Sequence, residues 1–291
     1  MSGDSIGVLG LGAMGEPMAR RLLAEHGRLV VHSRRRHAAL VDAGATWAPT
    51  PADLARRVDA VLVMLPDLPE LEAQLDGPDG LLAGDRELLL MIGSTSSPLG
   101  VRTLAEKVGR RTDGRVRVVD SPVSGGTDGA SAGTLSIMLG GDPVDTDRAA
   151  ALLAPCGNPV RLGPLGAGEV AKACNQLIVA STILALGEAT VLAERSGIDP
   201  RALWDLLGDG YAGSNLLTSR KERLVTGDDS PSGAARYMIK DLGFATDVAD
   251  DTATAAVMLP AVRSAFEELV AAGLGDRDIA VVRRFISERP A

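Results

Sequence analysis

A glycine-rich stretch near the start of the chain has the residue types and spacing that bind phosphate groups. It follows a short apolar run over residues 6–9 and is a complete G-x-G-x-x-G, namely Gly10-Leu11-Gly12-Ala13-Met14-Gly15. The first glycine allows a tight turn, the second lets the backbone approach a pyrophosphate, and the third lets a helix pack on a strand. Because apolar residues at helical spacing follow, the free N–H groups of a helix N-terminus would face the phosphates. The motif predicts a dinucleotide site; the alternative is a glycine-rich turn that binds no ligand.

A lysine in an apolar helix is a candidate for proton transfer. Lys172, Asn175 and Gln176 stand at positions i, i+3 and i+4, hence on one face of a helix. A lysine among apolar residues is costly unless it has a partner or a task, and desolvation lowers its pKa toward the range useful for proton transfer. We expect Lys172 to act as the acid/base, with Asn175 holding the ammonium or a substrate hydroxyl in line. The alternative is a lysine whose ammonium reaches back to water.

Small and polar residues in two loops are candidates for substrate and cofactor contacts. Ser124, Gly125 and Gly126 can turn several N–H groups toward one point, which suits a carboxylate; the alternative is a mobile connection. Thr95 follows an apolar run and either contacts the nicotinamide end of a cofactor or helps to cap the next helix. Lys240 lies in an apolar frame, and spacing leaves open whether it serves the site or pairs with a neighbouring acid.

The segment after the second apolar run indicates which dinucleotide is bound. NAD-binding folds often carry an acidic residue about 20 residues after the glycines. Here the position holds His32-Ser33-Arg34-Arg35-Arg36, and no Asp or Glu occurs between Glu25 and Asp42. A serine followed by guanidinium groups suits a 2′-phosphate. We therefore expect NADP to be preferred and NAD to be possible, with Ser33 and Arg34 as contacts; the alternative is a solvated, positively charged helix start.

The elements that must position these residues form an α/β pattern. Apolar runs separated by helical stretches predict a doubly wound, mostly parallel sheet of the Rossmann type, with strands over 6–9, 28–32, 59–65, 87–92, 115–119 and 135–139. From residue 165 onward the chain has helical periodicity. We expect one long helix over 170–196 and further helices over 200–207, 216–224, 234–250, 253–272 and 276–288.

This organisation predicts two domains joined by the long helix. The dinucleotide-binding domain spans residues 1–164, and an all-helical substrate domain spans 165–291. The glycines and proline of 162–168 predict a hinge there. Ligands of open α/β sheets bind at the carboxyl ends of the strands, so we expect the site in a cleft between the domains, where Lys172 must reach.

Composition limits the class of protein further. The net charge of −8 and the lack of a large basic block disfavour nucleic acid as the main partner. Two cysteines fit a reducing compartment, and the absence of a signal-peptide pattern and of eighteen uninterrupted apolar residues predicts a cytoplasmic protein that does not cross a membrane. The three histidines, at 26, 32 and 37, lie outside the candidate site without ligand spacing, so we expect no metal.

Taken together, the motifs resemble the β-hydroxyacid dehydrogenase family, which includes 3-hydroxyisobutyrate dehydrogenase and tartronate semialdehyde reductase. The resemblance covers nearly the whole chain, in the order GLGAMGEPMARRL, MLP, GSTSSP, DSPVSGGTDGASAGTL, GAGEVAKACNQ and KDLGFA. It implies dinucleotide contacts by Gly10, Gly12, Gly15, Leu65, Pro66 and Thr95. It also implies that Ser124, Gly125 and Gly126 bind the substrate carboxylate.

The resemblance implies the catalytic roles as well. Lys172 matches the family's acid/base, with Asn175 beside it, and Lys240 matches a lysine near the cofactor. The segment 210–214 is similar to that of tartronate semialdehyde reductases, and His32-Ser33-Arg34 is similar to the branch that uses NADP. The substrate class implied is a small 3-hydroxy acid or semialdehyde acid, and the implied assembly is a homodimer or homotetramer.

The expected reaction is hydride transfer between the nicotinamide and the carbinol or carbonyl carbon of such an acid, with Lys172 exchanging the proton. Two alternatives remain. One is an imine reductase of the same architecture, against which Lys172 counts because those sequences replace this lysine. The other is a protein that binds NADP without turnover, which would have no use for both the substrate loop and the lysine.

Overall fold

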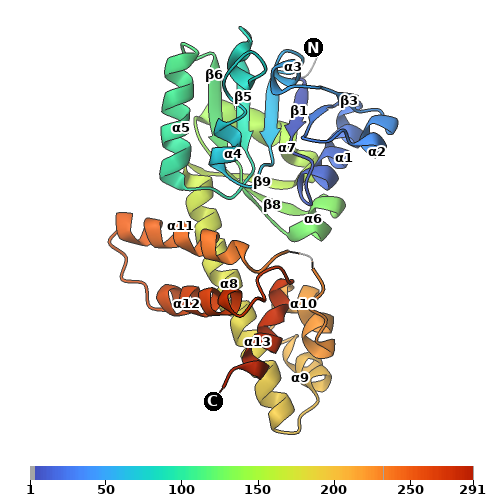
Figure 1. Cartoon of the computed structure of the whole chain (residues 1–291), viewed down its shortest axis with the longest axis vertical. Coiled ribbons are helices and arrows are strands. Elements are labelled where there is room, and N and C mark those ends of the chain that lie inside the picture. Colours follow the sequence, from blue (N-terminus) through green and yellow to red (C-terminus); the bar gives the residue numbers. More distant parts are fainter. Residues whose placement is uncertain (1–3, 232, 291) are drawn as a thin grey trace. The chain divides into compact units, whose positions relative to one another are not determined.

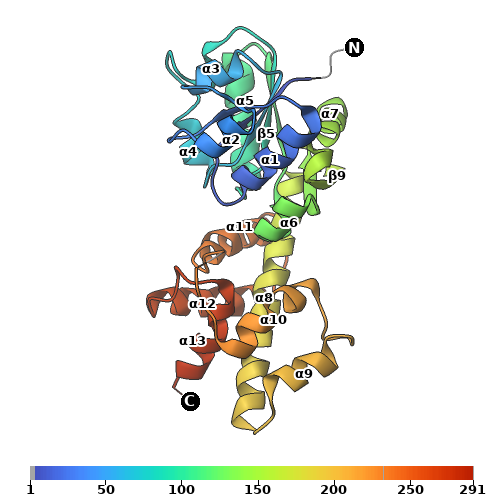
Figure 2. The ribbon, with the colours of Figure 1, turned by 90° about the vertical axis from the view of Figure 1, so that its right-hand side faces the viewer.

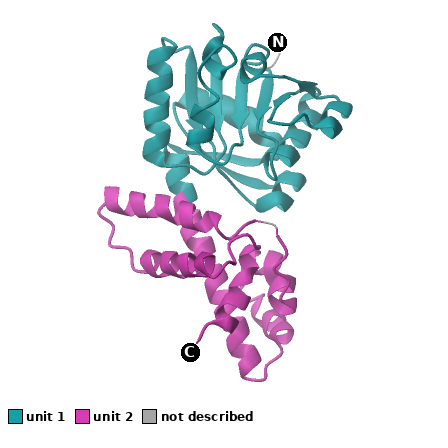
Figure 3. Ribbon diagram, viewed as in Figure 1, with its two compact units in different colours: residues 1–172 teal, residues 173–291 magenta. Residues whose placement is uncertain are grey.

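The structure is a computed structural model that describes residues 4–231 and 233–290. It divides into two compact units, residues 1–172 and 173–291 (Figure 3). The boundary between them falls inside the long helix α8, Ala167–Arg195. The domain ranges 1–164 and 165–291 stay a prediction.

Unit 1 is built on a nine-stranded sheet in the order β3-β2-β1-β4-β5-β6-β8-β7, with β9 pairing β8. Pairing is parallel from β3 to β6, and β8 runs antiparallel to β6 and β7. The strands are β1 Ile6–Leu9, β2 Val30–His32, β3 Thr46–Trp47, β4 Ala60–Val63, β5 Leu88–Ile92, β6 Val116–Asp120, β7 Val123–Ser124, β8 Leu135–Gly140 and β9 Gly157–Gly163. The mostly parallel, doubly wound sheet that the sequence predicts is therefore confirmed.

Helices cover both faces of this sheet (Figures 1 and 2). Side chains alternate along each strand, so apolar side chains lie on both faces and each face packs into a core of its own. In β4, Ala60 and Leu62 face one core and Val61 and Val63 face the other. The first core is closed by α1 Gly15–His26, α6 Gly126–Ala132 and α7 Pro143–Leu153. The second is closed by α3 Pro51–Ala55, α4 Leu68–Glu72 and α5 Pro98–Arg111. The unit also holds α2 Ala38–Asp42 and two 3₁₀ turns, Leu81–Ala83 and Ala154–Cys156.

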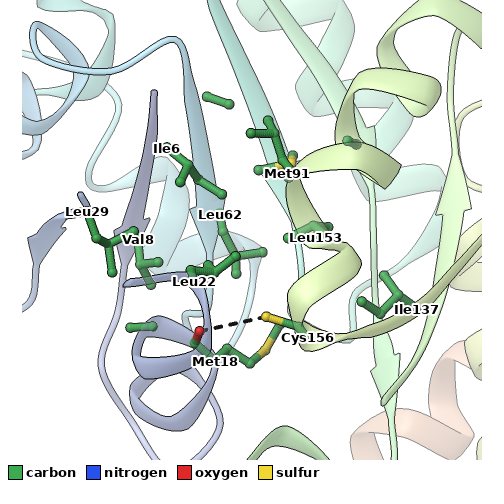
Figure 4. Packing of buried hydrophobic residues seen from close by; sticks show 14 of the residues in the cluster. Ile6, Val8, Met18, Leu22, Leu29, Leu62, Met91, Ile137, Leu153 and Cys156 are labelled. Carbon is green, nitrogen blue, oxygen red and sulfur yellow. Dashed lines mark hydrogen bonds between the residues drawn. The ribbon is translucent and has the colours of Figure 1, made fainter. Parts of the chain in front are cut away.

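The first core holds one of the two cysteines (Figure 4). Cys156 is fully buried and donates through Sγ to the backbone carbonyl of Met18, 3.7 Å away, next to Leu153. Burial raises the pKa of the Cys156 thiol to about 12. The thiol therefore stays protonated at neutral pH and packs as a small apolar group.

Unit 2 is helical around a core of its own. It contains the rest of α8, then α9 Pro200–Leu207, α10 Asn215–Thr226, α11 Tyr237–Asp251, α12 Met258–Ala271, the 3₁₀ turn Ile279–Val281 and α13 Val282–Glu288. Trp204 of α9, Leu242 of α11 and Phe266 of α12 meet in that core. The all-helical second part that the sequence predicts is confirmed.

Several predicted element boundaries were wrong. The helix predicted over 253–272 begins at Met258, because Ala253 has a φ of +52° that helical backbone excludes. The helix predicted from 234 begins at Tyr237, since the N–H groups of Ala235 and Arg236 donate across to residues 277 and 275. The stretch predicted as one helix over 276–288 is a 3₁₀ turn capped by Asp278, followed by α13.

Three strands have no counterpart in the sequence prediction. β3 and β7 contain two residues each, and β9 is an edge strand whose side chains are mostly half-buried or exposed. None of them contains an apolar run, so they depend on pairing with a neighbouring strand.

Within the described residues, α8 is the one helix long and apolar enough to cross a membrane by length and composition, with a mean hydropathy of 1.7 over its most apolar window. Half of that window is buried inside the structure, which the core helix of a soluble protein also shows. Length and composition therefore do not assign α8 to a membrane.

Candidate active site

The predicted dinucleotide residues of unit 1 follow the carboxyl ends of adjacent parallel strands. The glycine turn follows β1, Ser33 and Arg34 follow β2, Leu65 and Pro66 follow β4, and Thr95 follows β5. A hydrogen bond of 2.9 Å from the N–H of Gly10 to the carbonyl of His32 joins the turn to the end of β2. These segments lie at the edge of the sheet where ligands of open α/β folds bind.

The glycine turn fits a dinucleotide at each of its three glycines. Gly10 has a φ of +98°, and a Cβ there would lie 2.4 Å from the carbonyl oxygen of Met64. A Cβ on Gly15 would lie 2.1 Å from the carbonyl oxygen of Gly10, so α1 can start this close to β1 only without a side chain. A Cβ on Gly12 would meet nothing within 4 Å, which leaves its backbone open to a phosphate. The N–H groups of Glu16 and Met18 donate to the carbonyls of Gly12 and Met14, so the first turn of α1 would favour a phosphate through the positive end of the helix dipole.

The segment after β2 presents arginines to solvent. Arg34, Arg35 and Arg36 are exposed, and the Ser33 hydroxyl donates to the backbone carbonyl of Arg35 at 2.7 Å. That bond closes a tight turn directly after β2, whose last residue is bonded to the glycine turn. Residues 26–41 contain no carboxylate that could accept a hydrogen bond from the ribose 2′-hydroxyl of NAD.

Lys172 lies next to the predicted carboxylate loop. It is 8% exposed, and its Nζ donates to the backbone carbonyl of Val123 at 2.9 Å. Val123 immediately precedes Ser124, Gly125 and Gly126, whose glycines have φ values of +133° and +64° and therefore need to be glycine. The structure thus brings together the predicted acid/base and the predicted carboxylate-binding turn.

Two buried carboxylates, which the sequence prediction missed, fix the start of α8. Asp120, the last residue of β6, accepts from the N–H of Gly166 through Oδ1 at 2.7 Å and from that of Glu169 through Oδ2 at 2.8 Å. Glu169 accepts from the N–H of Ser96 at 3.0 Å, in the loop that carries Thr95. Burial raises the pKa of Asp120, and the backbone hydrogen bonds oppose part of that rise.

These bonds explain why α8 begins at Ala167 and not at the predicted Val170, because Asp120 caps the helix three residues earlier. The stretch 162–168, where we predicted a hinge, is bonded within unit 1. Besides Gly166, the carbonyl of Gly163 accepts from Gly141 at 3.1 Å, and that of Leu165 accepts from Arg102 at 3.1 Å. An acid directly before the S-P-V-S-G-G segment was the sequence signal for this cap.

Unit 2 connects the other two predicted site residues through Gln176 and Asp241. Asn175 donates through Nδ2 to Oε1 of Gln176 at 2.9 Å, and Gln176 donates through Nε2 to Oδ2 of Asp241 at 2.5 Å. Lys240 forms an ion pair with Asp241 at 3.8 Å, and its Nζ lies 5.6 Å from the ring centroid of Phe244. The structure therefore groups the predicted residues into one set in each unit, and the K-D pair was the signal for Asp241.

The sheet order, the glycine turn and the helical second unit define a nicotinamide-dinucleotide-binding oxidoreductase fold, and comparison with known proteins agrees. Residues 5–166 match the NAD-binding domain of 6-phosphogluconate dehydrogenase, and residues 166–286 match the NAD-binding domain of NADP-dependent 3-hydroxyisobutyrate dehydrogenase.

Two curated relatives match over almost their whole length. The NAD-dependent L-serine dehydrogenase of Pseudomonas aeruginosa is 33% identical over 290 residues, covering 96% of each chain. The L-threonate dehydrogenase of Cupriavidus necator is 33% identical over 287 residues, covering 97% of this chain and 96% of the relative. The solved 3-hydroxyisobutyrate dehydrogenase of Salmonella typhimurium has a TM-score of 0.87 at 26% identity, covering 97% of this chain and 99% of that one.

The chain belongs to the β-hydroxyacid dehydrogenase family. It is therefore an NAD(P)-dependent oxidoreductase that acts on the hydroxyl group of a hydroxy acid. An imine reductase from Myxococcus stipitatus is more distant, with 18% identity and a TM-score of 0.63, and shares the fold alone.

Proposed function

We propose that this enzyme interconverts a small 3-hydroxy acid and its semialdehyde acid, of the 3-hydroxyisobutyrate or tartronate semialdehyde type, with Lys172 as the acid/base. The observation that carries the proposal is the 2.9 Å hydrogen bond from Lys172 to the carbonyl of Val123, beside Ser124–Gly126. A 3-hydroxy acid whose carboxylate is held by that turn would place its hydroxyl oxygen, about three bonds from the carboxyl carbon, near the ammonium.

In the proposed mechanism the chain contributes orientation and proton transfer. When bound, the nicotinamide supplies or accepts the hydride. Ser124, Gly125 and Gly126 hold the carboxylate, and Asn175 orients the reacting oxygen. In the reducing direction the Lys172 ammonium gives a proton to the oxygen on which negative charge develops. In the oxidising direction the neutral amine takes the hydroxyl proton.

We also propose NADP as the preferred cofactor, held by the glycine turn, Leu65, Pro66, Thr95 and Lys240, with Ser33 and Arg34 at the 2′-phosphate. The support is the exposed arginines after β2 together with the missing acid. The cytoplasmic location, the absence of nucleic acid and membrane partners, and assembly as a homodimer or homotetramer stay predictions.

Initial rates with a substrate panel test the proposal. We expect NADP-dependent oxidation of 3-hydroxyisobutyrate, glycerate, L-serine or L-threonate, and NADPH-dependent reduction of the semialdehyde acids that match the first three. Esters of the same compounds should be poor substrates because they lack the carboxylate. Turnover of cyclic imines with no turnover of any hydroxy acid in the panel would contradict the proposal.

A further inference from the structure

Glu169 is a buried carboxylate with no role in the mechanism above. It is 1% exposed and lies in the first turn of α8, three residues before Lys172. A buried carboxylate is costly, and an exposed one would serve the helix dipole as well. Its Oε2 instead accepts from the backbone N–H of Ser96, 73 residues away in the sequence.

This hydrogen bond joins two segments of unit 1 that contact the cofactor or the substrate in the proposed function. On one side is the loop after β5, where Ser96 follows Thr95 and its hydroxyl donates to the carbonyl of Ser94 at 3.2 Å. On the other side is the turn of α8 that carries Lys172, one i, i+3 step from Glu169 and hence on the same helix face. A displacement at Glu169 would therefore reach both Thr95 and Lys172.

We propose that Glu169 is a positioning residue that fixes the Thr95 loop relative to the Lys172 ammonium through its hydrogen bond to Ser96. The proposal rests on the proposed function, in which Thr95 contacts the dinucleotide and Lys172 exchanges the proton. What is needed is an acceptor oxygen at this place, and the negative charge is not required. Because a misplacement of about 1 Å can cost about a hundredfold in rate, the bond bears on turnover more than on folding.

Two variants distinguish the role of the Glu169 acceptor oxygen from the role of its negative charge. Glu169→Met keeps the side-chain volume and removes the oxygen, whereas Glu169→Gln keeps an oxygen that can accept from Ser96. We expect kcat to fall about ten- to a hundredfold in Glu169→Met and to stay within about threefold of wild type in Glu169→Gln, with the same pH profile. Asp145→Asn, which removes another buried carboxylate of unit 1, is the control and should keep kcat.

Hydrogen exchange of the cofactor-free protein gives a readout independent of activity. Amides of residues 93–97 should exchange faster in Glu169→Met than in wild type and at the wild-type rate in Glu169→Gln. Circular dichroism and thermal unfolding confirm that each variant is folded, and if the Met variant does not fold, Glu169→Leu replaces it as the variant without the acceptor oxygen.

Two results would overturn the inference. Wild-type kcat in Glu169→Met would show that the bond does not matter. A loss in Glu169→Gln of tenfold or more, or a shifted pH profile, would show that the charge is what matters. The proposed function fails separately, if the wild type turns over no hydroxy acid or if Lys172→Ala keeps its rate.

Discussion

Lys172 and Glu169 both bond to backbone groups, and so does Asp120. Their partners are the carbonyl of Val123, the N–H of Ser96 and two N–H groups at the start of α8. A backbone partner is placed by the strand or loop to which it belongs, so it has no rotamer of its own to lose. The geometry at Lys172 is therefore set by the ends of β5, β6 and β7.

Replacing Lys172 by alanine should abolish turnover and leave NADPH affinity nearly unchanged. Asn175 and Gln176, the next residues along this helix face, are neutral amides that cannot pass a proton, and the Glu169 carboxylate one turn earlier is bonded to the N–H of Ser96. Losing a positioned acid/base costs about a hundred- to ten-thousandfold in rate. Steady-state kinetics and NADPH fluorescence titration check this, with Lys107→Ala, at a half-buried lysine of α5, as the control. A variant that kept more than about a tenth of the wild-type rate would make Lys172 a structural lysine.

Replacing Arg34 by alanine should weaken NADPH binding far more than NADH binding. A charge-assisted contact to a 2′-phosphate is worth roughly 1.5–3 kcal/mol, or about ten- to a hundredfold in affinity. Titrations of both cofactors at one ionic strength measure the difference, and Arg110→Ala on α5 controls for the loss of a surface charge. Equal losses for the two cofactors would identify Arg34 as a solvated surface residue.

At the scale of elements, the position of Lys172 depends on how the first turn of α8 is held. A helix start leaves four N–H groups without intrahelical partners. Two N–H groups at the start of α8 are bound by Asp120 at the end of β6, and the side chain of Glu169 reaches the loop after β5. The sheet thereby fixes both the position at which α8 begins and the strand ends that Lys172 faces.

Asp120→Asn should destabilise unit 1 by about 1–3 kcal/mol at neutral pH, because an amide offers one acceptor to two N–H groups and leaves one buried donor unsatisfied. The folded-state pKa of Asp120 is raised above 3.8, so the folded protein binds this proton more tightly than the unfolded chain. As the pH falls through the folded pKa toward 3.8, the wild type gains stability that the variant lacks.

Urea unfolding at pH 7.5 and pH 5, followed by Trp47 fluorescence in a Trp204→Phe background, reports on unit 1. The advantage of the wild type over Asp120→Asn should be larger at the lower pH. An advantage that shrank on acidification would contradict the direction of the pKa shift.

At the scale of the whole molecule, each unit has its own core, and unit 2 exposes large apolar side chains. Ile178 and Leu192 on α8 are 65% and 67% exposed, and Leu206 on α9 is 77% exposed. Ile178 and Leu192 are separated by about four helical turns, so they lie along one face of α8, and an exposed apolar face favours contact with another protein surface. A second copy of the chain is the partner we expect.

Light scattering on a sizing column should therefore give two or four times the chain mass of 30.0 kDa. Leu192→Glu should shift the mass toward one chain, because a carboxylate would have to be desolvated at the contact. Leu99→Glu, at an exposed leucine of unit 1, should leave the mass unchanged. A wild-type mass of 30.0 kDa at micromolar concentration would contradict the prediction.

The sequence by itself determined the features that depend on neighbouring residues. Gly10, Gly12 and Gly15 predict the turn because its constraints lie within one strand–turn–helix segment. The strand runs and the helical spacing of Lys172, Asn175 and Gln176 are equally local, and they were enough for the fold class and for the family resemblance. Boundaries such as the start of α12 at Met258 were missed, because the positive φ of Ala253 is not encoded in apolar periodicity.

Only the tertiary structure decided which groups hold the site in place. Asp120 and Gly166 are 46 residues apart, and Ser96 and Glu169 are 73 apart. Gln176 and Asp241, which connect Asn175 to Lys240, are 65 apart. Such pairs are brought together by strand order and helix packing, and no periodicity within a segment contains that information. A buried carboxylate also looks like a surface carboxylate in a sequence, because its cost and its partners exist only once the chain is folded.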